Sequence, residues 1–343
     1  MLRDRASVVT RWSGSQQLHG SPCCGHVTAQ RSGRPPARRY RPAVLTVLVL
    51  LLLGVALGQL RLLPDGAGSL LDTIVVRVAL PGLILAVVPE LEVGAEALVP
   101  VAAAWGSLAL LAGAVWVLGR VADLDRRTLG TLLLVVPLAN TGFLGYPAVE
   151  ALLGTDHLAD AIVYDQLGTF LALSTYAAVV AGRFGARATP TAGEMVRRVV
   201  TFPPFVALLV GGVALVAGGL PAPVAEVADR VGDTVTPLAM LAVGVRLRLQ
   251  GDAWRPALLG GGLALRLVVA PAVVVAVALA VGGEGTAWTT SALQSGMPPM
   301  VLAGVMAAQA ELDGELAARF VGVGVLASMV TLPAWAAVLE RLL

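Results

Sequence analysis

The amino-acid sequence predicts an all-α integral membrane protein of ten transmembrane helices, arranged as two inverted five-helix repeats in which the fourth and ninth helices are broken and cross. Three observations predict this fold. Of the 343 residues, 57% are apolar and 13% are charged, whereas soluble domains carry about 25% charged residues. Ten apolar segments are long enough to cross a bilayer, which takes about 20 helical residues. Finally, the two halves of the chain resemble each other.

The ten segments set the predicted domain boundaries. Short loops join nearly all of them, and the longest polar stretch, residues 182–200, separates a first repeat at 43–181 from a second at 201–343. We predict this stretch to be a cytoplasmic loop. The predicted spans are residues 43–60, 69–89, 97–119, 129–153, 158–181, 202–220, 226–247, 256–282, 287–310 and 317–341.

The two halves share motifs at one spacing. Leu80–Val87 resembles Thr236–Val243, and Gly168 resembles Gly324, in both cases 156 residues further along the chain. Because each repeat holds an odd number of helices, the second repeat must enter the membrane from the opposite side. Inverted repeats are typical of secondary transporters, whose binding site lies at the repeat interface near the midplane.

Arginines predict the orientation, since cytoplasmic loops are enriched in positive charge. An amino terminus outside a plasma or inner membrane places nearly all loop arginines on the cytoplasmic side and leaves only Arg230 and Arg341 outside. The arginine-rich arm of residues 1–42 opposes this rule, and we expect it to be disordered. We favour a start codon assigned too far upstream over a signal peptide. The cytoplasmic set is Arg61, Arg120, Arg126, Arg127, Arg183, Arg187, Arg197, Arg198, Arg246, Arg248, Arg255 and Arg319.

Two helix breaks at corresponding depths predict the binding site. Asn140–Pro147 interrupts the fourth segment and Gln294–Pro299 interrupts the ninth. Proline removes a backbone donor, and the freed polar groups must line protein or a polar cavity. The amino termini of the half-helices favour an anion. An ordinary bend explains one break alone, but two related breaks favour a site. Its predicted residues are Asn140, Thr141, Gly142, Gly145, Pro147, Gln294, Ser295, Gly296 and Pro298.

Charged residues inside the other spans are secondary candidates. Asp165, beside Tyr164, is a candidate for coupling transport to protons, and a structural hydrogen bond to a broken helix explains it equally well. Arg266 requires a carbonyl or carboxylate partner, so we favour a structural role over substrate attraction. We expect Asp233 to mark the wetted end of its helix and Arg77 to extend toward the membrane surface.

Four motifs resemble the auxin efflux carrier family, which includes plant auxin carriers and bacterial malate or malonate permeases. They are Asn140–Pro147 with Leu152–Gly154, Pro237–Gly244, Arg266–Pro271 and Gln294–Pro299, and the resemblance covers the chain from about residue 43 to its end. It implies a scaffold domain, a transport domain, and an organic anion bound where the two broken helices cross. Asn140, Pro147 and Pro298 stand at matching positions.

The predicted function is secondary transport of a small organic anion, such as a mono- or dicarboxylate, by alternating access. The sequence contains no Lys and therefore no phosphate-binding Gly-x-x-x-x-Gly-Lys loop. We predict no enzyme activity, cofactor, metal or nucleic acid partner, because His157 beside Asp156 and Asp160 is too small a set for catalysis. A membrane sensor that binds an anion without flux is the alternative. Na⁺, H⁺ and the membrane potential are all candidate driving forces, and a homodimer is an alternative to a monomer.

Overall fold

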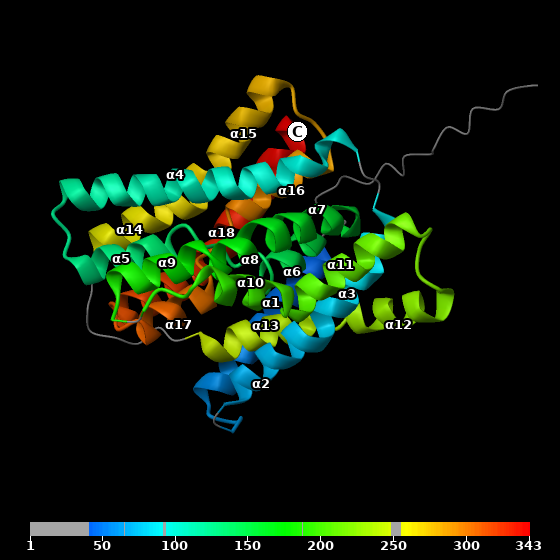
Figure 1. Cartoon of the computed structure of the whole chain (residues 1–343), viewed down its shortest axis with the longest axis horizontal. Coiled ribbons are helices and arrows are strands. Elements are labelled where there is room, and N and C mark those ends of the chain that lie inside the picture. Colours follow the sequence, from blue (N-terminus) through cyan, green and yellow to red (C-terminus); the bar gives the residue numbers. More distant parts are fainter. Residues whose placement is uncertain (1–40, 65, 92–93, 187, 248–254) are drawn as a thin grey trace, which may run out of the picture.

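The computed structural model describes residues 41–343 except 65, 92–93, 187 and 248–254. Its described part consists of helices joined by short connections, with one isolated β-bridge and no strand (Figure 1). Within it, five helices are long and apolar enough to cross a membrane, and a sixth qualifies if α10 and α11, bent by 63°, form one span. The chain is therefore a multi-pass membrane protein, and the ten-span count stays a prediction.

Helix lies within every segment that the sequence predicts to be a span. In chain order the elements are α1 (Arg41–Gln59), α2 (Ala67–Ile74), η2 (Val75–Ala79), α3 (Leu80–Val87), η3 (Val88–Glu90), η4 (Ala95–Leu98), α4 (Val99–Val121), α5 (Arg126–Val135), α6 (Gly145–Leu152), η5 (Thr155–His157), α7 (Leu158–Val163), η6 (Tyr164–Thr169), α8 (Phe170–Ser174), α9 (Tyr176–Phe184), α10 (Ala192–Val200), α11 (Pro203–Val216), α12 (Ala222–Gly232), α13 (Val235–Arg246), α14 (Pro256–Ala264), η7 (Leu265–Val269), α15 (Ala270–Val281), α16 (Thr286–Ser295), α17 (Val301–Gln309) and α18 (Gly314–Leu342).

Three details differ from the sequence prediction. The stretch 182–200 is not only loop, because α10 forms there behind a capping box in which Thr191 and Glu194 satisfy each other's backbone amides. The seventh predicted span is two helices that meet at Asp233, the residue after α12 ends. Helix α1 begins at Arg41, inside the predicted arm, and residues 1–40 of that arm lie outside the described part of the chain.

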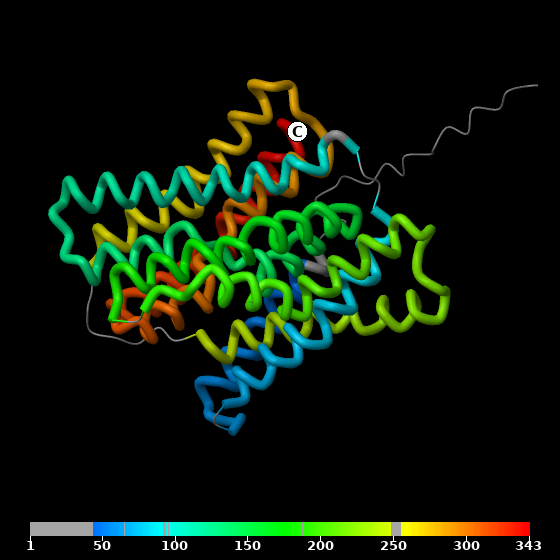
Figure 2. The backbone as a smooth tube through the Cα atoms, in the orientation of Figure 1, coloured from blue at the N-terminus to red at the C-terminus, as the bar shows by residue number. Residues whose placement is uncertain are grey.

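The helices pack as two groups. In the first group, α1 and α2 pack against α13, and α3 packs against both α11 and α12. Gly54 and Gly244 bring α1 and α13 into backbone contact, since a Cβ at Gly54 would lie 2.6 Å from the Leu241 carbonyl oxygen. The second group contains α4–α9 and α14–α18, and an apolar core that includes Leu111, Leu134 and Phe320 joins most of its helices. The tube in Figure 2 shows the first group in blue and yellow-green at the lower right.

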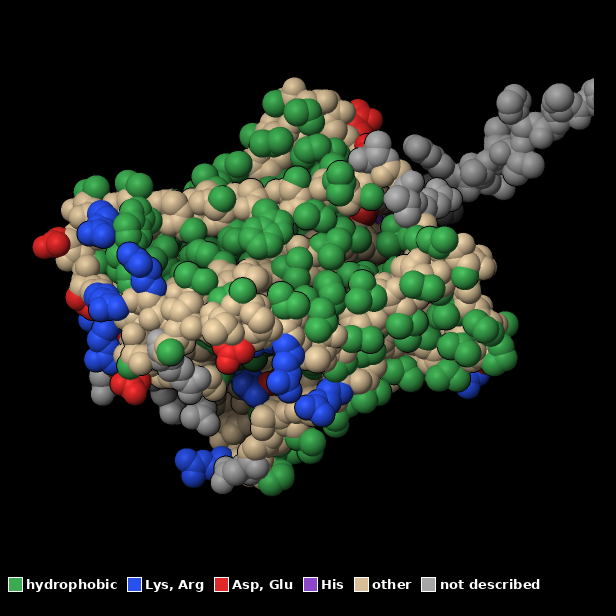
Figure 3. Space-filling view, viewed as in Figure 1, with side chains coloured by type: hydrophobic (Ala, Val, Ile, Leu, Met, Phe, Trp, Pro, Cys, Tyr) green, Lys and Arg blue, Asp and Glu red, His purple; other side chains and the backbone are tan. Residues whose placement is uncertain are grey.

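Charged side chains are distributed unevenly over the surface. In Figure 3, arginines gather over the end of the molecule where α4 ends and α5 begins, whereas the opposite end shows little blue. Helix α5 starts in this region, where Asp125 accepts hydrogen bonds of 3.0 Å from the amides of Arg127 and Thr128. Hydrogen bonds from Thr128 lower the pKa of the Asp125 carboxyl, so this cap is charged at neutral pH.

Candidate functional site

The two predicted helix breaks lie against each other. Between α5 and α6, and again between α16 and α17, the chain leaves the helix, and the two connections pair at Ala139 and Pro299 as an antiparallel bridge. The amide of Asn140 donates to the Pro298 carbonyl oxygen at 2.8 Å, and the amide of Met300 donates to the Leu138 carbonyl oxygen at 2.9 Å. Each break thus supplies backbone partners to the other, which satisfies groups that lipid could not.

Arg266 forms hydrogen bonds with both helix breaks. This side chain lies in η7, is 1% exposed, and donates to the carbonyl oxygens of Pro137 at 3.1 Å, Ser295 at 2.5 Å and Met297 at 2.9 Å. Those carbonyls follow the carboxyl ends of α5 and α16, where helix dipoles favour a positive charge. The carbonyl partners expected for a buried arginine are therefore present, and they come from both broken helices.

Asp165 accepts several hydrogen bonds beside the first helix break. Its carboxylate accepts hydrogen bonds from Thr141 Oγ1 in the first break, from Tyr146 Oη at 2.8 Å and from Gln166 Nε2 at 2.8 Å. Asp165 is 5% exposed. The structure thus contains the hydrogen bond to a broken helix that was one of the two sequence-based interpretations of this residue.

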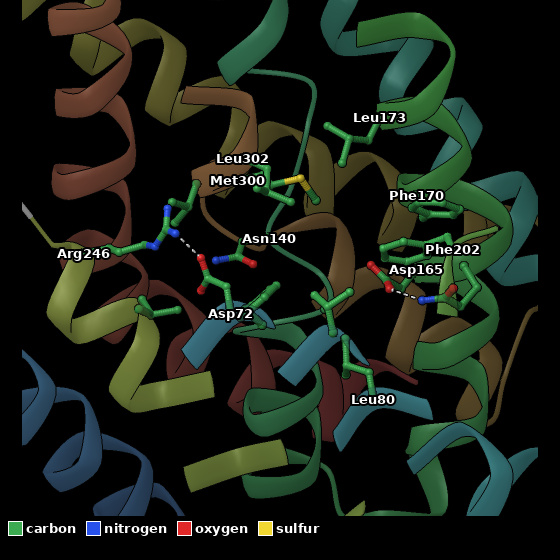
Figure 4. Close-up of a pocket in the computed structure, with 16 residues that line it drawn as sticks. Asp72, Leu80, Asn140, Asp165, Phe170, Leu173, Phe202, Arg246, Met300 and Leu302 are labelled. Carbon is green, nitrogen blue, oxygen red and sulfur yellow. Dashed lines mark hydrogen bonds and ion pairs between the residues drawn. The ribbon is translucent and has the colours of Figure 1, made fainter. Parts of the chain in front are cut away.

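A cavity of about 60 Å³ lies between the crossover and the first helix group. Asn140, Gly142 and Asp165 line it from the crossover side. Asp72 of α2 and Arg246 of α13 line it from the other side and form an ion pair (Figure 4). The remaining lining is Gln166 and the apolar residues Val76, Leu80, Phe143, Phe170, Leu173, Phe202, Val243, Met300, Val301 and Leu302.

Two side-chain amide atoms on this cavity lack hydrogen-bond partners among the described residues. Asn140 is 1% exposed, and its Nδ2 makes no hydrogen bond, although its backbone amide is bonded to Pro298. Gln166 Oε1 is buried and unbonded as well. Buried polar atoms nearly always have partners. One free donor and one free acceptor at the same cavity therefore indicate a site for a polar ligand.

The other predicted site residues build the crossover and do not line the cavity. Gln294 Nε2 donates to the Thr141 carbonyl oxygen at 3.4 Å, and a Cβ at Gly145 would collide with the Gln294 side chain. Ser295 Oγ turns back to the Ala292 carbonyl oxygen of its own helix. Pro147 and Gly296 are buried away from the lining, and so is Tyr164, which borders a separate small space beside Arg266.

Sequence reasoning missed the residues that the first helix group contributes. Asp72 is a carboxylate inside an apolar segment, the same signal that identified Asp165, and Arg246 stands at the end of another span. Their ion pair is visible only in the folded structure. Phe170 and Phe202 stack with ring centroids 4.0 Å apart at the cavity edge, and no sequence pattern indicated that contact.

Two crevices approach the crossover from opposite sides. One, of about 960 Å³, lies between α2, α13 and the helices α17 and α18, and shares Arg246 and Val301 with the cavity. The other, of about 720 Å³, lies between α3, α12 and α7, and reaches Tyr146 of the crossover. Among the described residues, no group of three or more His, Cys, Asp or Glu side chains is arranged to hold a metal ion.

Comparisons with known proteins point the same way as the geometry. Residues 42–336 match the model of a family described as membrane transport protein. The chain is 30% identical over 305 residues to an uncharacterized transporter of Methanothermobacter thermautotrophicus, covering 86% of this chain and 97% of that protein. It is 26% identical over 309 residues to an uncharacterized transporter of Methanocaldococcus jannaschii, covering 85% and 96%.

Proposed function

Since the chain belongs to the auxin efflux carrier family of membrane transport proteins, we propose that it carries a small organic anion, a mono- or dicarboxylate, by alternating access around the crossover cavity. The single observation that carries this proposal is the cavity itself. The unbonded Nδ2 of Asn140 lies on one wall and the guanidinium of Arg246 lies on the other. Both groups can donate hydrogen bonds to a carboxylate.

The half-helix α17 supports an anion as the ligand. Its first residues, Val301 and Leu302, line the cavity together with Met300, and no side chain caps this helix start. The first amides of a helix have no intrahelical partner and carry partial positive charge. The apolar remainder of the lining suits the carbon skeleton of an organic acid better than an inorganic anion.

The two crevices support alternating access. The cavity between them is small, at about 60 Å³. We infer that the two helix groups move relative to each other when a carboxylate ligand enters. We assign the group with α1, α3, α11 and α13 as the scaffold and the group with the crossover as the moving transport domain.

The sequence motifs support inverted repeats. Leu80–Val87 resembles Thr236–Val243 and Gly168 resembles Gly324, each 156 residues further along the chain, and inverted repeats place a binding site at their interface. The arginine distribution favours a plasma or inner membrane with the amino terminus outside.

Flux into proteoliposomes tests the proposal and separates it from a sensor. Purified protein is reconstituted with unlabelled malate or phenylacetate inside, and uptake of the same radiolabelled anion is followed against protein-free vesicles. A stability screen with the same anions reports binding, since a ligand of the folded state raises the unfolding temperature. Stabilisation together with uptake supports the carrier, and stabilisation without uptake identifies a sensor.

A further inference from the structure

Tyr146 separates two spaces that both reach the centre of the molecule. Tyr146 is one of the residues that line the acidic crevice between α3, α12 and α7. Its hydroxyl donates a hydrogen bond of 2.8 Å to Asp165, and Asp165 borders the anion cavity. Tyr146 is 1% exposed and Asp165 is 5% exposed. These two side chains therefore close the path between crevice and cavity, and they are joined by a hydrogen bond.

The crevice on the far side of Tyr146 is strongly acidic. Glu150 follows Tyr146 by one turn of α6 and borders the same space, and its carboxylate accepts a hydrogen bond of 2.7 Å from Thr236. No arginine is among the lining residues, and a concave surface of one sign concentrates positive counter-ions, protons included. The carboxylates that line the crevice are Glu90, Glu150, Asp156, Asp160, Asp229 and Asp233.

No cation neutralises Asp165 among the described residues. The groups that face it are Thr141, Tyr146 and Gln166, all hydrogen-bond donors without charge. Arg246, across the cavity, is paired with Asp72, and Arg266 is bonded to backbone carbonyls. The charge of Asp165 therefore changes only through a proton or a bound ion, and Tyr146, which lines the crevice, is hydrogen-bonded to it through a hydroxyl that can pass a proton.

We propose that Tyr146 relays protons between the acidic crevice and Asp165, and that this relay couples anion transport to the proton gradient. The inference rests on the proposed transport function. In each transfer, the phenol oxygen accepts a proton from a hydronium ion in the crevice, which becomes water, while its own hydrogen moves to Asp165 Oδ2. Tyrosine is regenerated, and the net change is one proton lost by hydronium and gained by the aspartate.

Tyr146→Phe tests the relay, because phenylalanine keeps the ring and removes the hydroxyl. Two fluxes are measured in the same proteoliposomes: exchange of radiolabelled malate for internal malate at equal pH, and proton movement driven by a malate gradient, read with an internal pH dye. We expect the ratio of proton flux to exchange to fall at least about tenfold. Tyr176→Phe is the matched control, since Tyr176 donates to the Leu133 carbonyl oxygen inside the same helix group, and its ratio stays at the wild-type value.

Two further variants keep the test decisive. Asp165→Asn removes the proton acceptor, and we expect it to lose proton flux as Tyr146→Phe does. Glu150→Gln changes the crevice wall, and we expect it to weaken the dependence of uptake on the pH of the crevice side. This second measurement does not depend on whether Tyr146→Phe folds. A wild-type flux ratio in Tyr146→Phe overturns the relay. Wild-type exchange of malate and phenylacetate without proton movement also overturns it and leaves the transport function intact, whereas no exchange of either anion by the wild type overturns both.

Discussion

The backbone amide of Asn140 donates to the carbonyl oxygen of Pro298, while Nδ2 of the same side chain, at the cavity, has no hydrogen-bond partner among the described residues. One residue thus has two separate tasks. Its backbone joins the fourth-segment break to the ninth-segment break, and its side chain is available to a ligand. Since the main-chain bond does not depend on residue type, the two tasks are separable by mutation.

Asn140→Ala is expected to abolish most transport while leaving the fold intact. The substitution keeps the bond to Pro298 and removes the free donor, and a hydrogen bond to a charged ligand contributes about 1.5–3 kcal/mol, or roughly 10- to 150-fold in affinity. Radiolabelled malate and phenylacetate uptake, together with the unfolding temperature in detergent, measures both effects. Ser295→Ala is the contrast, because that hydroxyl turns into its own helix. Wild-type uptake by Asn140→Ala would remove this side chain from the mechanism.

The crossover was predictable because its signals are local. Gly142, Gly145 and Pro298 interrupt apolar runs, and a break inside a membrane-length helix has few physical explanations. Burial of Arg266 was predictable for the same reason. The identity of its three carbonyl partners was not predictable, since these carbonyls come together only when two breaks that are distant in the sequence meet in the folded structure. The family resemblance, drawn from motifs at those breaks, is confirmed by the match over residues 42–336.

The other wall of the cavity was not predictable, because it depends on how separate helices face each other. Asp72 and Arg246 lie on different helices, and neither position is marked by a local break. The sequence therefore identified the polar elements of the crossover without the ion pair opposite them. Ser295, Gly296 and Pro147 do not line this cavity, and their contact with a ligand stays a prediction.

Arg266→Lys is expected to lower both stability and transport. A lysine ammonium group cannot reach all three carbonyl oxygens that the planar guanidinium spans. At least one of the hydrogen bonds to Pro137, Ser295 and Met297 is therefore lost. With about 1.5–3 kcal/mol per hydrogen bond to a charged group, we expect destabilisation of about 2 kcal/mol or more. Thermal unfolding in detergent measures it. Arg230→Lys is the matched control, because Arg230 is exposed and forms a surface ion pair with Glu226. Equal unfolding temperatures for the two variants would contradict a stabilising role for the Arg266 hydrogen bonds.

The Asp72–Arg246 pair is expected to respond differently to single and double substitution. Arg246→Gln leaves Asp72 with an unpaired charge beside the anion site, so uptake should fall strongly and, because the pair is partly buried, stability should drop by about 1–3 kcal/mol. Asp72→Asn with Arg246→Gln removes both charges and should restore most of the stability. If Arg246 attracts the anion, the double variant still shows a raised KM. A double variant with wild-type KM would assign the pair a purely structural role.

Close contact of α1 and α13 is expected to be essential for the scaffold. A Cβ at Gly54 would lie 2.6 Å from the Leu241 carbonyl oxygen and 3.1 Å from Gly244 Cα, and both neighbours are backbone atoms that cannot move aside independently. Gly54→Ala should therefore cost about 1–3 kcal/mol, as overpacked cores do. Gly113→Ala in α4 is the matched control, since nothing lies within 4 Å of the added carbon, and its stability should equal that of the wild type or rise slightly. Thermal unfolding of both variants in the same detergent decides the matter: if Gly54→Ala unfolds at the temperature of Gly113→Ala, the two helices do not pack backbone to backbone in the membrane protein.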